Sequence, residues 1–440
     1  MRLATPPMTR ILAVVAATAS FALAAAPAAA QGTALERRAQ EMADLITADA
    51  TAADSTFAPS FLAQLPAARM SDIARQIHAQ YGEVTRWRLV EAAPTGFSGR
   101  FTFVTERGFE MPVELAVSAD PPHRVTGIFF RPGVPMAADW SELDARLDSL
   151  PGTTSMLVAE LTADGLRPIH AVRADEQLAI GSAFKLWVLA ELAAQIEAGE
   201  RESDDVVALP DSPSLPSGIL QDWPAGAPVT LHTLATLMIS ISDNTATDAL
   251  IGQLGREALE ARVAAIGHAR PALNQPFLTT RELFVLKAPA ERSLAERWLG
   301  ADPAARRALL RDEVADRELA LAMWERPFAI DRIEWFASAY DLARTMAALH
   351  RIADGDTTSP ALRIMAVNPA LTAAEDWPYV GYKGGSEPGV LALAWLALTP
   401  DGRWLALTGT WNDPDAALDH SAFVALLERA ATLAAGGATP

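Results

Sequence analysis

Only three lysines stand beside thirty-three arginines in this 440-residue chain, and one of them follows a serine by three positions. In the stretch IGSAFKLWVLAEL, Ser182 opens an apolar run at helical spacing and Lys185 falls in its first turn. Residues three apart share a helix face, so we expect the amine beside the hydroxyl. The helix dipole and burial both disfavour the charged form of such a lysine. A neutral amine beside a hydroxyl is a general base, a role that arginine cannot fill because it keeps its proton.

Two further motifs combine serine, lysine and small residues. Ser242-Asp243-Asn244 ends an apolar helical run, and Lys383-Gly384-Gly385-Ser386 closes a strand. Each motif has a purely structural alternative: Ser182 as a helix N-cap, the second motif as a junction between helices, and the third as a glycine turn with an exposed lysine. The order of the three motifs along the chain favours chemistry over these alternatives.

Ser-x-x-Lys, Ser-Asp-Asn and Lys-Gly-Gly in this order resemble the penicillin-recognising serine hydrolase superfamily, and most closely the class A β-lactamases. The resemblance covers residues 140–436. It implies that Ser182 is acylated, that Lys185 assists removal of the serine proton, and that Ser242 relays a proton to the leaving group.

The same resemblance implies a set of substrate-binding residues. Asn244 would bind the substrate's side-chain amide, and Lys383 would attract its carboxylate and help to keep the catalytic lysine neutral. Gly385 would let the substrate lie flat against the strand edge. Its neighbour Ser386 would contribute a backbone N–H to the oxyanion hole, together with the N–H of the acylated serine. No cofactor or metal is implied.

The sequence departs from the family pattern twice, first beside the substrate carboxylate, where a hydroxyl is missing, and then in the loop that serves release of the acyl group. Gly384 replaces the usual threonine of the third motif. The region GHARPALNQPFLTTRELF contains Leu273-Asn274 but lacks the deacylating glutamate three residues earlier. The nearest glutamate is Glu282, which is a low-ranked candidate for deacylation because Thr279-x-x-Glu282 is a typical capping box. We therefore expect slow or atypical deacylation.

The domain organisation follows from patterning along the chain. Residues 1–30 resemble a secretory signal peptide cleaved after Ala30, with periplasmic export as the expectation. Residues 31–131 predict helices up to about 81 and then four antiparallel strands, a small α+β domain. Residues 132–139 contain two prolines and read as a linker.

The rest of the chain, residues 140–436, predicts a second α+β domain. An antiparallel sheet is expected from both ends of this domain, with an all-helical block inserted between. VLALAWLALT is apolar at nearly every position and predicts a central strand. A small domain before a β-lactamase-like one resembles the accessory serine hydrolases of clavulanic-acid gene clusters, whose N-terminal domain is steroid-isomerase-like and which also lack the loop glutamate.

The amino-acid composition limits the classes of partner that the chain can bind. The chain carries 54 Asp+Glu against 36 Lys+Arg, a net charge of -18, which argues against nucleic acid or an anionic membrane as partner. It contains no cysteine, which excludes disulfides and thiolate chemistry. We expect a small-molecule substrate and no membrane span after signal removal. Two alternatives to β-lactam, ester or amide hydrolysis stay open: a DD-peptidase-like cell-wall enzyme, and a non-hydrolytic binder of β-lactams or peptidoglycan fragments.

Overall fold

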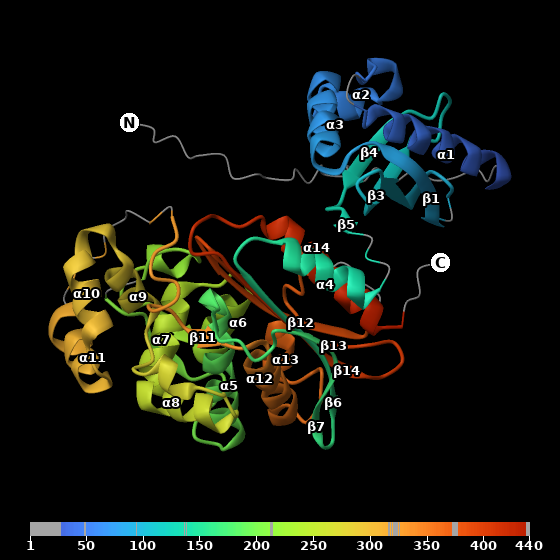
Figure 1. Ribbon diagram of the computed structural model, residues 1–440. Helices are drawn as coiled ribbons and strands as arrows, with labels where there is room; N and C mark the ends of the chain where they lie inside the picture. The colour runs from blue at the N-terminus through green and yellow to red at the C-terminus, as the bar shows by residue number, and fades with distance from the viewer. Residues whose placement is uncertain are drawn as a thin grey trace. The chain divides into compact units, whose positions relative to one another are not determined.

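The computed structural model describes residues 28–436 except 48–49, 94, 136, 138, 212–213, 316, 318, 320–323, 325 and 372–376. The described chain separates into two compact units, one up to residue 136 and one from residue 137 onward. Both units combine helices with antiparallel sheet (Figure 1), so the α+β prediction is confirmed. The expected signal peptide lies almost wholly outside the described residues.

The smaller unit packs helices against a meander of strands in the order β1-β2-β3-β4, with β5 paired to β3. Aromatic and aliphatic side chains of the sheet, such as Phe103 and Val113, form its core with Leu35 and Met70 from the helices. The elements are α1 (Ala28–Leu45), α2 (Pro59–Leu62), α3 (Ala67–Tyr81), β1 (Val84–Ala92), β2 (Ser98–Thr105), β3 (Phe109–Val117), β4 (Val125–Phe130) and β5 (Val134–Pro135).

The helical run predicted up to residue 81 is interrupted between α1 and α3. Pro59 occupies the first turn of α2 and Pro66 is the N-cap of α3. Proline lacks an N–H and clashes with the preceding turn, so it begins helices and does not continue them. Periodicity alone therefore located the helical region, but it did not show where one helix ends and the next begins.

The larger unit is built on a five-stranded antiparallel sheet in the order β12-β13-β14-β6-β7. Its first strands in the chain, β6 and β7, lie at one side, and the last three complete the other, as the sequence predicted. β13 is buried on both faces between β12 and β14. The strands are β6 (Thr153–Thr162), β7 (Gly165–Val172), β12 (Tyr379–Glu387), β13 (Val390–Leu398) and β14 (Trp404–Asn412).

Two short strand pairs and eleven α-helices complete this unit among the described residues. The strand pairs are β8 (Leu178–Ala179) with β11 (Phe336–Ala337), and β9 (Val206–Ala208) with β10 (Pro228–Thr230). The helices are α4 (Trp140–Ser149), α5 (Lys185–Glu197), α6 (Leu231–Ser240), α7 (Asn244–Leu254), α8 (Arg256–Ala265), α9 (Thr280–Lys287), α10 (Arg292–Gly300), α11 (Pro303–Leu309), α12 (Ala339–Ile352), α13 (Pro360–Met365) and, after the last strand, α14 (His420–Ala434).

The two faces of the large sheet bury different helices. α4 and α14 cover one face and form a cluster around Trp395 and Phe423. α12 and α13 lie against the other face and α5 packs on α12, in the larger core that gathers Leu157, Phe184 and Trp187 (Figure 1). The inserted helical block therefore holds the segment from Gly181 to Lys185 firmly against the sheet.

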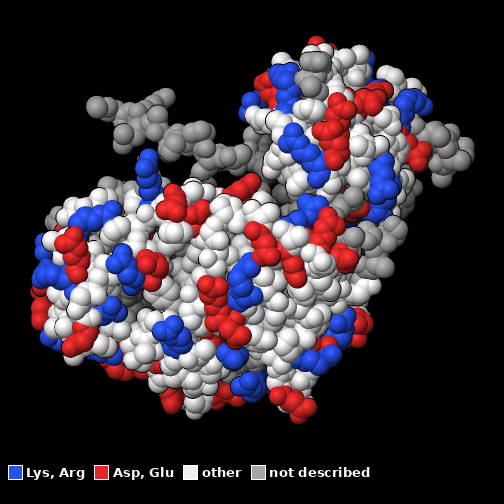
Figure 2. All heavy atoms as spheres, viewed as in Figure 1, with Lys and Arg blue, Asp and Glu red and all other residues white. Residues whose placement is uncertain are grey.

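The surface carries mixed charge. On the face shown in Figure 2, acidic and basic side chains lie interspersed over both units. Within the described part of the chain, no helix is long and apolar enough to cross a membrane.

Candidate active site

The three sequence motifs meet at one cavity of about 700 Å³ in the larger unit. The residues that line it from these motifs are Gly181, Ser182, Ser242, Asn244, Lys383, Gly384, Gly385 and Ser386. They come from the turn before α5, the α6–α7 junction and the end of β12. Segments that lie sixty and two hundred residues from Ser182 in the sequence therefore line a single cavity.

Ser182 lies in a 3-10 turn, Gly181–Phe184, immediately before α5. The N-cap alternative does not hold, because α5 begins at Lys185 and its cap residue, Phe184, makes no side-chain capping bond. Gly181 has φ of 47°, in the left-handed region that favours glycine. The Ser182 hydroxyl makes no hydrogen bond to any described residue, and its side chain is half-buried at the cavity wall.

Lys185 is fully buried and its amine faces three oxygen atoms. Nζ lies 3.0 Å from Ser242 Oγ, 2.6 Å from the Ser242 carbonyl oxygen and 2.7 Å from Asn244 Oδ1. The carbonyl and amide oxygens only accept, whereas the hydroxyl can also donate. A neutral amine therefore satisfies all three contacts by donating two hydrogens and accepting one.

Electrostatics favour that neutral form. Burial, with a further contribution from the nearby positive charge of Lys383, holds the pKa of Lys185 well below its usual value. Asp248 and Asp243 act in the opposite direction but do not outweigh desolvation. The neutral amine is therefore favoured, and in this form it can accept a proton.

In the Ser242-Asp243-Asn244 motif, Ser242 and Asn244 line the cavity, and Asp243 holds the surrounding backbone in place. Ser242 has φ of 60°, a strained conformation for a residue with a side chain. Asp243 caps α7 through Ala246 N–H at 2.8 Å and accepts from the N–H groups of Ile219 and Leu220 at 2.7 and 2.9 Å. Asp243 thus fixes the neighbouring loop, which positions the wall of the cavity.

Asn244 connects Lys185 to this loop. Its Oδ1 accepts from Lys185, and its Nδ2 donates to the Leu215 carbonyl at 3.0 Å. One hydrogen on Nδ2 remains for a further acceptor at the cavity wall. That position suits the amide-binding role implied by the sequence resemblance.

The third motif runs along β12 directly beside the serine. A Cβ on Gly385 would overlap the Ser182 N–H and the Ile180 carbonyl, so only glycine allows this approach of strand and turn. The approach brings the backbone of Ser386 against the 3-10 turn. Lys383 is buried, and burial lowers its pKa to about 7. Its Nζ donates to the Gly384 carbonyl.

Glu282 lies away from this cavity. It forms the predicted capping box with Thr279 at the start of α9 and pairs with Arg256, Nη2 to Oε1, at 2.7 Å. The cavity lining among the described residues does not include it. The Leu273-Asn274 pair is also outside the lining, with Asn274 bonded to the backbone of Phe336 at 2.9 Å.

Comparison with known proteins agrees with the geometry. A sequence model of the β-lactamase enzyme family matches residues 140–376, more than half of the chain. The chain belongs to this β-lactamase family. Comparison with curated proteins returned no significant match.

Solved structures similar to this β-lactamase family member cover about two thirds of the chain. A β-lactamase from Sphaerobacter thermophilus DSM 20745 is 24% identical, with TM-score 0.47, over 68% of this chain and 97% of that one. A β-lactamase from Chitinophaga pinensis DSM 2588 is 16% identical, with TM-score 0.47, over 67% and 98%. A mutant of PBP-A in an acyl-enzyme complex with penicillin G is 18% identical, with TM-score 0.46, over 67% and 96%.

In this β-lactamase family chain, the sequence analysis missed part of the cavity wall. Glu334, Trp335 and Glu387 line the cavity together with the motif residues. Both glutamates approach the third lysine, Lys287, which is fully buried. The signal that could have found this group was present, because Lys287 is another lysine in an arginine-rich chain.

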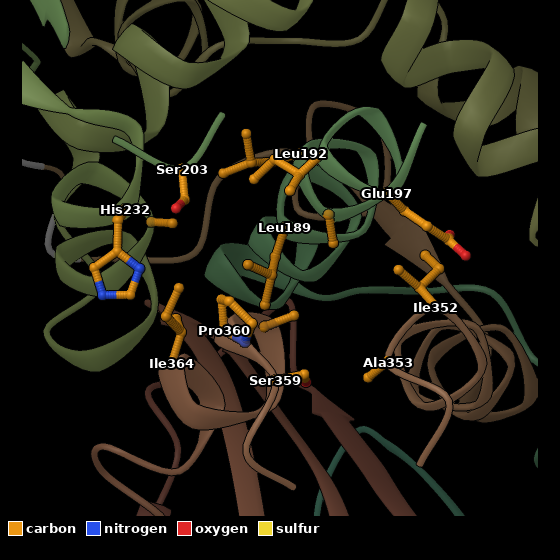
Figure 3. Close-up of a pocket in the computed structure, with 14 residues that line it drawn as sticks. Leu189, Leu192, Glu197, Ser203, His232, Ile352, Ala353, Ser359, Pro360 and Ile364 are labelled. Carbon is orange, nitrogen blue, oxygen red and sulfur yellow. The ribbon is translucent and has the colours of Figure 1, made fainter. Parts of the chain in front are cut away.

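A second hollow of about 250 Å³ lies at the other end of α5 (Figure 3). Leu189, Leu192 and Ile364 point into it, with His232 and Glu197 at its margin. Its lining is mostly apolar and contains none of the motif residues. No group of three or more His, Cys, Asp or Glu able to hold a metal occurs among the residues described.

Proposed function

We propose that this protein is an exported serine hydrolase that forms an acyl-enzyme on Ser182 with β-lactam or related ester or amide substrates. The observation that carries the proposal is the buried amine of Lys185, which is bonded to Ser242, while Ser242 lines the same cavity as Ser182. A lysine with a lowered pKa that contacts a serine hydroxyl at such a cavity is the kind of base that activates a serine nucleophile.

In acylation, Ser182 Oγ attacks the substrate carbonyl carbon and its proton passes to Lys185 Nζ. The bond between that carbon and the leaving nitrogen or oxygen then breaks, Ser242 Oγ passes its proton to the leaving group, and Lys185 Nζ returns a proton to Ser242 Oγ. The backbone N–H groups of Ser182 and Ser386 are proposed to hold the oxyanion, a contribution that is commonly large in acyl transfer. A charged Lys383 attracts the substrate carboxylate at one end of the cavity.

Release of the acyl group is proposed to be slow. The carboxylates that line the cavity among the described residues are Glu334 and Glu387. Burial raises the pKa of Glu334 to about 8, with the negative charge of Glu387 adding to the effect. A carboxyl group that holds its proton at neutral pH is a poor base for activating water.

The test combines a chromogenic cephalosporin with intact-mass spectrometry. We expect a mass increase equal to the acyl group on the wild-type protein, with turnover slower than acylation, and neither on Ser182→Ala. Release of D-alanine from a pentapeptide mimic would instead indicate a DD-peptidase. If wild type and Ser182→Ala both stay unmodified and inactive with β-lactams and esters, the proposal is wrong.

Export is a separate part of the proposal and rests on the N-terminal pattern of two arginines, an apolar run and small residues up to Ala30. Expression in a Gram-negative host should place the mature protein in the periplasm, with Gln31 as its first residue. Recovery of the uncleaved chain from the cytoplasm would contradict it.

A further inference from the structure

A buried cluster of one lysine and two glutamates forms part of the active-site wall. Lys287 ends α9, Glu334 precedes β11, and Glu387 ends β12. Their side chains are 0%, 1% and 9% exposed. Lys287 Nζ contacts Glu387 Oε1 and lies 3.7 Å from Glu334 Oε1. Two carboxylates therefore share a single buried ammonium, which leaves this part of the cavity short of positive charge.

Both carboxylates keep one oxygen without a hydrogen-bond donor. Glu334 Oε2 accepts from the N–H groups of Gly181 at 3.2 Å and Trp335 at 2.8 Å. Glu334 Oε1 and Glu387 Oε2 are buried and have no hydrogen-bond partner among the described residues. Buried acceptors are normally satisfied, so two such oxygens at the lining of one cavity indicate a missing donor. Burial raises the pKa of Glu334 to about 8, with the negative charge of Glu387 adding to the effect, so this carboxyl holds its proton at neutral pH in the free protein.

The cluster lies at the opposite end of the reaction site from Lys383. β12 is an edge strand of the sheet, and four residues along it separate Lys383 from Glu387. Four residues of strand span roughly 13 Å. Gly385, midway between them, is the position that meets the Ser182 N–H. A substrate lying along this edge with its carboxylate at Lys383 and its carbonyl at Ser182 therefore extends its acyl side chain toward Glu387.

We propose that Glu334 and Glu387 bind a positively charged group on the acyl side chain of the substrate. This inference rests on the proposed function and narrows its substrate class to molecules with a carboxylate on the leaving side and an ammonium on the acyl side. With the ammonium bound, Glu334 gives up to water the proton that it holds in the free protein, and the ammonium donates to Glu334 Oε1 and Glu387 Oε2 through charge-assisted hydrogen bonds. Trp324 and Phe284 line the same cavity, and Lys287 Nζ already lies over the Trp324 ring, 5.6 Å from its centroid.

The test uses two 6-acylaminopenicillanates that differ only in one terminal ammonium, with pentanoyl and 5-aminopentanoyl side chains. An alkyl ammonium stays charged across the working pH range, and the flexible chain can adapt its reach. The second-order rate constant of acylation is measured for each by intact-mass spectrometry. We expect the wild type to favour the ammonium substrate by about tenfold, the equivalent of one charge-assisted hydrogen bond.

Glu334→Gln and Glu387→Gln should each bring the ratio of the two rate constants close to one. The matched control is Glu260→Gln, which removes a buried carboxylate that pairs with Arg307 outside the cavity. That variant should keep the wild-type ratio. The wild-type comparison itself needs no variant, so it stands even if a substitution impairs folding.

The outcomes separate this inference from the function on which it rests. Equal rate constants for the two penicillanates on the wild type would overturn the ammonium site while leaving acylation intact. Failure of both compounds to acylate the wild type would contradict the proposed function. A Glu334→Gln variant that keeps the substrate preference but holds every adduct longer would show that Glu334 acts on the deacylating water, and would also overturn the ammonium site.

Discussion

The amine of Lys185 and the hydroxyl of Ser242 lie 3.0 Å apart, and Ser242 lines the same cavity as Ser182. Because the amine's other two neighbours can only accept hydrogen bonds, the hydroxyl is the one contact that can donate to a neutral lysine. This relationship joins two motifs that are separated by more than fifty residues in the chain. It also makes the charge state of one lysine the quantity on which acylation depends.

Replacing Lys185 with arginine should abolish acylation of Ser182 while the fold stays intact. Arginine retains a positive charge but cannot accept the serine proton, and general-base contributions are typically on the order of a hundred- to ten-thousandfold. Adduct formation with a chromogenic cephalosporin is measured by mass, and circular dichroism reports the fold. Lys185→Met serves as the matched uncharged variant and should be equally inactive. Acylation at the wild-type rate in Lys185→Arg would remove the lysine from the role of base.

The acylation rate should fall as pH decreases through the lowered pKa of Lys185. Below that pKa the amine is protonated and cannot take the serine proton. Since the positive charge of Lys383 contributes to lowering this pKa, Lys383→Met should shift the acidic limb of the profile to higher pH. An activated ester without a carboxylate is the right substrate, because its binding does not need Lys383. A limb that stays in place would show that the two lysines are not coupled.

Glu282 should contribute to stability and not to deacylation. Its side chain accepts from the Thr279 N–H at 2.8 Å and pairs with Arg256. Glu282→Ala removes both contacts and should cost about 1–2 kcal/mol in urea unfolding. Glu282→Gln keeps the geometry of the capping box and should cost less. The half-life of the acyl-enzyme, followed by mass, should match wild type in both variants. A longer half-life in the glutamine variant would identify Glu282 as the deacylating base.

The sequence predicted those parts of the site whose residues lie close together in short motifs. Ser182 and Lys185 are three residues apart, and the glycines of the third motif record the close approach of β12 to the 3-10 turn. The order of the motifs suggested the family, and the family indicated that they face one another. The same local patterns predicted the antiparallel strands and the capping boxes.

The missing part of the site consists of single residues on separate elements. Lys287, Glu334 and Glu387 come together because α9, the segment before β11 and the end of β12 pack at one place. No periodicity or spacing relates these positions, so no local pattern could bring them together. The composition held one clue, since each of the three lysines is buried in this structure while the arginines include many exposed ones.

Glu334 should make the folded state less stable as pH rises from about 4.5 to about 8. Its pKa is raised in the folded protein from 4.5 to about 8, chiefly by burial and also by Glu387, with Lys287 opposing the shift. Over this range the unfolded chain loses a proton that the folded chain retains, so the free energy of unfolding declines with pH and levels off above about 8. Glu334→Gln carries no such proton and should lack this part of the slope. Urea unfolding of wild type and variant between pH 5 and pH 9 measures the difference.

Lys287→Met provides the companion measurement for Glu334. Because the lysine charge lowers the pKa of Glu334, its removal should extend the decline in stability beyond pH 8, whereas Glu334→Gln should flatten it. The two substitutions therefore shift the pH profile in opposite directions even if both destabilise the protein at neutral pH. Parallel profiles for wild type and Glu334→Gln would mean that the Glu334 carboxyl titrates normally in the folded protein. In that case this wall of the cavity would not lack positive charge.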